Sequence, residues 1–225
     1  MRRLASALTL FTILGSARAS TGDACHTSCL DMPQGVTFCT TAARVDTTAG
    51  PDPTHVCGCY TGGFDIPNAT LYTTACSSFG TCHPRVTVED DFTLSGLPPG
   101  TPVAFTARFE VALTGSNLMG PGSGDARVVE GASNTSSVHH NLNDFYGNTV
   151  STPLSVPVIA IVGTPFHILY EVTGVVGELC YVEWHGTFLF ADLPSGVAVN
   201  SCNGFVQAAT PAHPVSWGSL KAAYR

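Results

Sequence analysis

Every second residue of the stretch "VAFTARFEVAL", residues 103–113, is apolar. Val103, Phe105 and Phe109 therefore share one side of an extended chain, while polar residues such as Arg108 fall on the other side. Side chains alternate with a period of two in a strand, whereas one face of a helix returns every 3.6 residues. The stretch predicts a half-buried β-strand that presents one face to a hydrophobic core.

The same two-residue period recurs along the chain from Arg85 onward. The expected strands cover residues 86–94, 103–113, 126–130, 137–142, 149–156, 158–162, 166–173 and 180–190. They are separated by Gly- and Pro-rich turn sequences such as "SGLPPGT", and helical periodicity nowhere exceeds two turns. The pattern predicts an all-β fold, an antiparallel β-sandwich that is jelly-roll-like. Pro153 and Pro157 are expected at an edge or a bulge, because proline cannot donate to a ladder.

Residues 1–19 have the order of a secretory signal peptide. Two arginines precede an apolar run from Leu4 to Leu14, and the small-x-small sequence Ala17-Arg18-Ala19 follows. The apolar run is shorter than the about 20 residues that span a bilayer. We therefore expect residues 1–19 to be removed and the mature protein to be secreted, in an extracellular or periplasmic space and with no membrane span.

The charge of the mature chain excludes one class of partner. Cleavage after residue 19 leaves six basic residues against 16 acidic ones, a formal charge of −10. Nucleic-acid binding relies on a basic surface that displaces the counterions of the phosphates. We therefore expect no nucleic-acid partner. Such a charge keeps a secreted protein soluble and suits a neutral or cationic partner.

Seven of the nine cysteines lie between residues 25 and 82. The candidate disulfide cysteines are Cys25, Cys29, Cys39, Cys57, Cys59, Cys76, Cys82, Cys180 and Cys202. Residues 20–84 are poor in Leu, Ile and Val, so they cannot bury enough apolar surface to offset chain entropy unaided. We therefore expect a cysteine-rich, disulfide-held module at 20–84, the β-sandwich domain at 85–207 and a flexible C-terminal tail at 208–225.

Zinc is the competing explanation for these cysteines, because "CH" at 25–26 and "HVCGC" at 55–59 mix thiol and imidazole groups. The sequence has no Cys-x-x-Cys pair to support it, and thiols oxidise in the compartments that exported proteins reach. We favour disulfides. Seven is an odd number, so the module either leaves one thiol out or sends a bridge beyond it. Cys82 is the candidate for a bridge to Cys180 or Cys202, while the pairing as a whole stays open.

Two neighbouring expected strands, 166–173 and 180–190, are joined by a short loop that contains glycine. If they pair as a hairpin, Glu171 lies opposite Glu183, with two histidines diagonal to them. The candidate metal ligands on this face are His167, Glu171, Glu183 and His185. Such a set suits zinc or another divalent ion. No metal-site spacing motif supports it, so a solvated face with weak pairs is the simpler interpretation, and we expect no cofactor.

The segment "SSVHHNLNDFYGN" at residues 136–148 offers imidazole, carboxylate and aromatic groups near an expected loop. Loops at the ends of sandwiches carry much of their recognition, so this loop is a candidate site for a sugar or an ion, although a plain polar connection is the simpler interpretation. Trp217 is a further exposed-aromatic candidate in the tail. The candidate binding residues are His139, His140, Asp144, Tyr146 and Trp217.

Several phrases carry a resemblance to a known group of proteins. "DFTLSGLPPGTPVAFTARFEVALTG", "EGASN", "GTPFHILYEVTG" and "FLFADLPSGVAVNSCNGF" resemble the repeated phrases of uncharacterised secreted bacterial β-sandwich proteins, over roughly Val86 to Phe205. The closing "SWGSLKAAYR" is similar to a tail of some of them. The resemblance implies the fold and export, and it implies no catalytic residue. The cysteine-rich start departs from it.

The sequence gives little support for a catalytic site, and it has no Gly-x-Ser-x-Gly elbow of the kind that carries a nucleophilic serine. We therefore expect a non-catalytic exported protein, either a surface or matrix component or a recognition module for a glycan or an extracellular protein. The alternative is a metal-dependent hydrolase that uses the four His and Glu residues of the expected hairpin.

Overall fold

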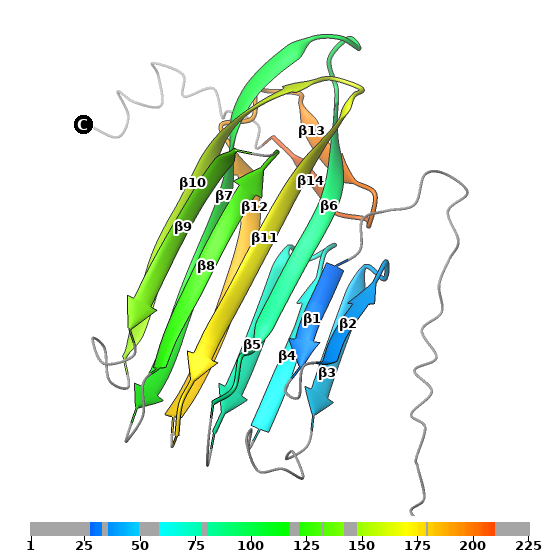
Figure 1. Ribbon diagram of the computed structural model, residues 1–225. Helices are drawn as coiled ribbons and strands as arrows, with labels where there is room; N and C mark the ends of the chain where they lie inside the picture. Colours follow the sequence, from blue (N-terminus) through cyan, green and yellow to red (C-terminus); the bar gives the residue numbers. More distant parts are fainter. Residues whose placement is uncertain are drawn as a thin grey trace, which may run out of the picture.

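Two antiparallel β-sheets pack face to face in the computed structural model (Figure 1). The structure describes residues 28–32, 36–49, 59–77, 81–117, 122–131, 133–141, 148–178 and 180–209. Over these ranges it consists of strands, turns and loops without a helix, and hence without a helix long and apolar enough to cross a membrane. The predicted all-β antiparallel sandwich is confirmed. The expected signal peptide and tail residues 210–225 lie outside the described residues.

The first sheet, sheet A, has the strand order β14-β13-β6-β11-β8-β9, and β1 pairs with both β2 and the start of β6. Its strands are β1 (Ser28–Met32), β2 (Val36–Thr40), β6 (Arg85–Ser95), β8 (Gly122–Glu130), β9 (Asn134–Asn141), β11 (Pro165–Val176), β13 (Ala198–Ser201) and β14 (Val206–Ala208). The long strand β6 is thus a partner for strands from both ends of the chain.

The second sheet, sheet B, has the order β10-β7-β12-β5-β4-β3. Its strands are β3 (Arg44–Ala49), β4 (Cys59–Asp65), β5 (Thr70–Cys76), β7 (Pro102–Asn117), β10 (Thr149–Ile161) and β12 (Cys180–Ala191). All its neighbours are antiparallel, as are those of sheet A.

The alternating apolar residues fill the space between the sheets. Val103, Phe105 and Phe109 of β7 are buried, as the two-residue period predicts. Trp184 of β12 is fully buried and donates its indole N–H to the carbonyl oxygen of Thr173 at 2.9 Å, which satisfies its one polar group. Each large apolar side chain removed from water in this way contributes about 1.5–3 kcal/mol. The core therefore holds the two sheets together.

The two prolines of β10 lie at the edge of sheet B, as expected, because β10 has β7 as its only ladder partner. The carbonyl oxygen of Pro157 accepts a hydrogen bond from the side chain of Asn134 of β9 at 2.6 Å, which places the unpaired side of β10 toward β9. Proline lacks the N–H that a further strand would use there. β10 is one strand rather than the two expected, since an edge strand tolerates Pro157 without a break.

The expected boundary near residue 84 does not separate two bodies. β5, from the cysteine-rich part, pairs with β12 over residues 70–76, and β1 pairs with β6. Leu30, Tyr60 and Phe64 are buried in the same core as the later strands. The cysteine-rich part gains its apolar burial from the two sheets, so it does not need to fold as a separate module, and this expectation is corrected.

The hairpin of β1 and β2 is joined by a disulfide between Cys29 and Cys39, which lie directly opposite each other in the ladder with Cα atoms 4.2 Å apart. Cys76, Cys82 and Cys202 are also disulfide-bonded, as predicted. Cys25, Cys57 and the side chain of Cys59 lie outside the described residues.

Cys180 corrects one part of the disulfide prediction. Its sulfur is a buried thiol that donates to the carbonyl oxygen of Glu178 at 3.3 Å. Cys180 is the first residue of β12, and its side chain points into the core, only 2% exposed. The expected bridge at this position is therefore wrong.

Candidate functional site

The structure separates the residues that the sequence placed in one metal site: His167, Glu171, Glu183 and His185. β11 belongs to sheet A and β12 to sheet B, so the two strands face each other across the core. Their inward rings pack together, with the centroids of Tyr170 and Phe188 4.5 Å apart. Their outward side chains consequently lie on opposite surfaces. The expected site is wrong, and no group of three potential ligands in the described ranges is arranged to hold a metal ion.

The connection between these strands explains the error. A short loop predicts a hairpin, but β11 ends at Val176 in sheet A and β12 begins at Cys180 in sheet B. Each strand is already flanked on both sides, β11 by β6 and β8, and β12 by β7 and β5. Alternation identifies the buried face of a strand, but it does not say to which sheet the strand belongs.

Glu171 lies on the outer face of sheet A, yet its side chain is only 7% exposed. Two arginines of neighbouring strands cover it. The Nε of Arg85 donates to Oε2 at 2.8 Å, and the Nε of Arg127 lies 2.7 Å from Oε1. The hydroxyl of Thr87 also donates to Oε2, at 3.1 Å. Charge-assisted contacts of this kind satisfy the carboxylate, which therefore acts as a structural ion in the sheet.

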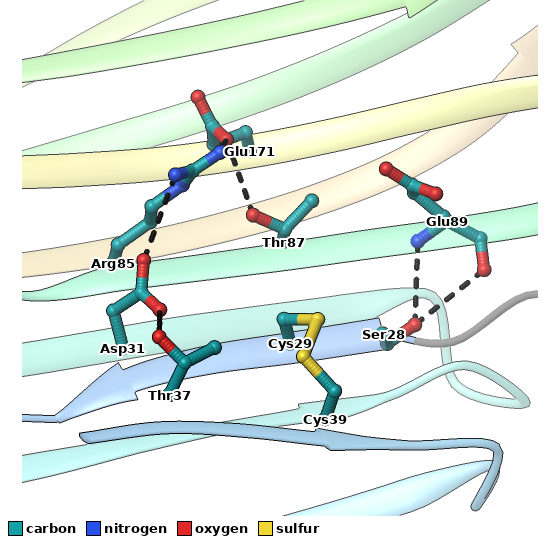
Figure 2. The surroundings of a disulfide bond; sticks show 9 residues. All are labelled: Ser28, Cys29, Asp31, Thr37, Cys39, Arg85, Thr87, Glu89 and Glu171. Atoms are coloured by element: carbon teal, nitrogen blue, oxygen red, sulfur yellow. Dashed lines mark hydrogen bonds and ion pairs between the residues drawn. A yellow bond between two sulfur atoms is a disulfide. The ribbon is translucent and has the colours of Figure 1, made fainter.

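The same network extends to the N-terminal hairpin (Figure 2). Arg85 lies 3.6 Å from Asp31 of β1, and Asp31 accepts a hydrogen bond from Thr37 of β2 at 2.6 Å. Further along β6, the strand that carries Arg85, the backbone N–H of Glu89 donates to the hydroxyl of Ser28 in β1 at 3.2 Å. The outer face of sheet A is thus tied across β2, β1, β6, β11 and β8.

His139 and His140 lie in β9, in agreement with the strand expected at 137–142, so their side chains point to opposite faces of sheet A. Nδ1 of His139 is 2.7 Å from Oδ1 of Asp125 on the outer face, and Nε2 of His140 is 3.1 Å from the hydroxyl of Thr152 in β10. The expected convergence of these two histidines in a loop site is wrong. The other candidates fall outside the described residues: Asp144, Tyr146 and Trp217.

His167, the remaining candidate of sheet A, lies on its outer face beside β6. Its Nδ1 is 3.4 Å from Oδ1 of Asp91, its ladder partner. This pair and the network around Glu171 thus join acidic and basic side chains on the outer face of sheet A.

The register of sheet B places residues of four neighbouring strands in one row across its outer face. His185 of β12 is the ladder partner of Tyr72 in β5. Gly63 of β4 is the partner of both Tyr72 and Asp46 of β3. Directly opposed residues in a ladder share a face. We call these four residues the Tyr72 row.

Gly63 lets the ring of Tyr72 cross β4. A Cβ at this position would lie 2.9 Å from both Cε1 and Oη of Tyr72, and closer still to the carbonyl oxygen of Val45. The hydroxyl of Tyr72 donates to Asp46, two strands away. Burial, and then this hydrogen bond to a carboxylate, raise the pKa of Tyr72, so the phenol remains a donor. A partly exposed ring therefore lies along the sheet.

The other end of the row carries His185 and its partners. The rings of His185 and Tyr72 are stacked, with centroids 6.3 Å apart and 21° between their planes. Nε2 of His185 is 2.6 Å from Oε1 of Glu183, and the hydroxyl of Tyr181 donates to the same carboxylate. These contacts, that of Tyr181 first, hold the pKa of Glu183 below its usual range. An anionic acceptor thus flanks the planar groups.

Sequence reasoning singled out the β12 residues of this surface but missed Tyr72, Gly63 and Asp46. All three fall in the part that was assigned to a separate module. One signal was present in the sequence of β4: "GG" at residues 62–63, since glycine inside a strand often marks the close approach of another group.

The fold and this surface define a two-sheet antiparallel sandwich whose sheet A carries the ion-pair network of Glu171 on its outer face and whose sheet B carries a polar, aromatic row. A comparison with protein-family models, curated proteins and solved structures gives no match for the chain. The resemblance to secreted bacterial β-sandwich proteins therefore stays an expectation.

Proposed function

We propose that the protein is an exported, non-catalytic recognition module that binds a glycan through the outer face of sheet B. The observation that carries the proposal is the Tyr72 row, in which a phenol ring crosses a glycine between an imidazole and a carboxylate. The row stands on four hydrogen-bonded strands, so its groups are held in place before a ligand arrives.

The chemistry of the row suits a sugar. A sugar ring has an apolar C–H face and a rim of hydroxyl groups, and an aromatic side chain with a polar end offers the complement of both. Tyr72 supplies the ring, while Asp46 and Glu183 supply ionised acceptors, whose hydrogen bonds are about twice as strong as neutral ones. A long glycan chain can run along such an open face.

Export supports the same proposal. A disulfide between Cys29 and Cys39 suits a compartment in which thiols oxidise, and residues 1–19 have the order of a signal peptide. In an extracellular or periplasmic space, at the cell surface or in a matrix, the protein meets glycans. The hydrolase alternative has lost its basis, because its four residues lie on opposite surfaces.

The proposal is tested by a glycan array probed with labelled mature protein. We expect binding to one family of oligosaccharides, loss of that binding in Tyr72→Ala, and retention of most of it in Tyr72→Phe, which keeps the ring. Ile159→Ala is the matched control, since this side chain is 75% exposed on β10 of the same sheet. Absence of any ligand, or equal binding by Tyr72→Ala and the control, would reject the proposal.

A further inference from the structure

We infer that the ligand of the Tyr72 row is a cationic amino sugar, an oligosaccharide whose 2-amino groups are not acetylated. The inference rests on the proposed function, because it names the class of glycan that the same row takes.

The charge pattern of sheet B leads to this class. Its described strands carry four acidic residues on the outer face, and three of these have a basic partner on the same face. The pairs are Asp65 with Arg44, Glu110 with Arg108 and Glu183 with His185. Asp46 differs: it accepts the hydroxyl of Tyr72 and has no basic partner within 4.0 Å among the described residues. Among the residues that the structure describes, the exposed carboxylate at the end of the row is therefore without a counterion.

A carboxylate beside an aromatic ring selects for an ammonium group. The negative face of the Tyr72 ring attracts a cation, and Asp46 provides the opposite charge at the end of that ring. An amine bound there makes an ion pair and a cation–π contact together. The formal charge of −10 on the mature chain also draws a polycation toward the protein.

An amino sugar fits this arrangement better than a basic peptide does. A lysine carries its ammonium at the end of a flexible stem, whose freedom is lost on binding to an open face. An amino sugar carries its amine directly on a rigid ring, so the C–H face of the same ring covers Tyr72 while the amine reaches Asp46. The next hydroxyl groups along the chain then approach Glu183, which His185 and Tyr181 hold in its anionic form.

The test is a calorimetric titration of the mature protein, in mild acid and at low salt, with two hexasaccharides: the glucosamine oligomer and its fully N-acetylated counterpart. We expect the glucosamine oligomer to bind roughly tenfold more tightly. Asp46→Asn keeps an acceptor for the Tyr72 hydroxyl, and it should remove most of this preference, because it weakens binding of the glucosamine oligomer much more than binding of the N-acetylated oligomer. Glu110→Gln removes the same charge elsewhere on the face and should leave the preference intact.

The outcomes separate this inference from the proposed function. If both oligomers bind equally, or if Asp46→Asn and Glu110→Gln weaken binding alike, the amine is not recognised at Asp46, and the inference fails while a neutral glycan site stands. If oligolysine binds more tightly than the glucosamine oligomer and depends on Asp46, the site takes a basic peptide and the inference is overturned. If no glycan of the array and neither hexasaccharide binds, the proposed function fails with it.

Discussion

The side-chain amide of Gln207 takes the place of a neighbouring strand beside Phe190. The N–H of Phe190 donates to Oε1 of Gln207 at 2.9 Å, and Nε2 of Gln207 donates to the carbonyl oxygen of Phe190 at 2.6 Å. The pairing of β5 with β12 ends at Thr187, so the backbone of Phe190 lies beyond the last partner on that side. The side chain of Gln207 in β14 of sheet A therefore supplies the hydrogen bonds that a neighbouring strand would give to Phe190 in β12 of sheet B.

Replacement of Gln207 by leucine should therefore destabilise the protein. The variant leaves an N–H and a carbonyl group of Phe190 without partners in a partly buried place, at a cost of about 1–3 kcal/mol in the free energy of unfolding. Urea unfolding measures this cost. Val206→Ala, on the same strand with a side chain 67% exposed, is the control and should change stability by less than about 0.5 kcal/mol. Equal midpoints for the two variants would mean that water replaces the amide.

Removal of the Glu171 carboxylate should cost more than removal of an exposed one. In Glu171→Ala, Arg85 and Arg127 lose their shared anion and repel each other. Loss of one partner of a fully buried pair costs about 3–5 kcal/mol. We expect a smaller value, about 1–3 kcal/mol, because both arginines are 43% exposed and solvent takes up part of their charge.

The matched variant for this measurement is Glu110→Ala. Glu110 pairs with Arg108 at 3.1 Å, but both side chains are largely exposed, so we expect a loss of only about 0–1 kcal/mol. Thermal unfolding of both variants at low and at high salt makes the comparison. A loss in Glu171→Ala no larger than that of Glu110→Ala would show that the network around Glu171 does not stabilise sheet A.

The disulfide of the first hairpin should stabilise the N-terminal edge of sheet A. Cys29 and Cys39 are separated by 10 residues in sequence, and a bridge that closes such a short loop contributes about 2–4 kcal/mol. The double variant with alanine at both positions should unfold at lower urea concentration. Its amide hydrogens in β1 and β2 should exchange faster than those of β7, because the hairpin opens locally before the core does. Unchanged exchange in β1 would contradict this account.

The sequence predicted the strands of this fold better than their partners. Alternation in "VAFTARFEVAL" and in "FHILYEV" identified which residues are buried, because burial of one face leaves a two-residue period in any strand. A strand shows this two-residue period whichever of the two sheets it belongs to, so the period does not identify its partner. For this reason the pairing of β11 with β12 was predicted as a hairpin, although the structure places Tyr170 and Phe188 across the core from each other.

The candidate site depended on these long-range pairings even more strongly. His185, Tyr72 and Asp46 are far apart in sequence and meet only because β12, β5, β4 and β3 are neighbours in sheet B. The local composition of the N-terminal part, with many cysteines and few large apolar residues, pointed to a separate module. Its short strands instead use the core of the later strands, and this contribution from distant sequence has no local signature.

Glu183 should make the stability of the protein depend on acidity in one direction. Its hydrogen bonds to Tyr181 and His185 lower its pKa in the folded state, so this carboxyl stabilises the fold above its ordinary pKa, and the contribution is lost as the pH falls through the lowered value. Glu183→Gln should therefore be less stable than the parent at neutral pH and equal to it in strong acid. Urea unfolding at a series of pH values measures the difference. A gap that does not change with pH would mean that charge has no part in it.

Asp90 should make the stability of the protein depend on pH in the opposite direction. It faces the core beside Phe92, fully buried, and its Oδ1 accepts hydrogen bonds from the backbone of Asp91 at 2.9 Å and from the side chain of Asn203 at 3.2 Å. Burial raises its pKa despite these bonds. The folded state therefore favours the protonated carboxyl, whose contribution is present below the ordinary pKa of aspartate and is lost as the pH rises through the raised value. Asp90→Asn keeps the acceptor and removes the charge.

This variant should be more stable than the parent at neutral pH, and the gain should shrink as the pH falls and the parent becomes protonated. The measurement is the same pH series of urea unfolding curves, with Asp91→Asn as the control, because Asp91 lies on the outer face next to His167. If Asp90→Asn is instead less stable than the parent at neutral pH and this loss shrinks in acid, the ionised carboxylate is the form that the fold requires. The turn that carries Cys202 and Asn203 would then depend on the buried charge of Asp90, which accepts the hydrogen bond from the Asn203 side chain. In the same turn the N–H of Cys202 donates to the carbonyl oxygen of Asp91 at 3.0 Å.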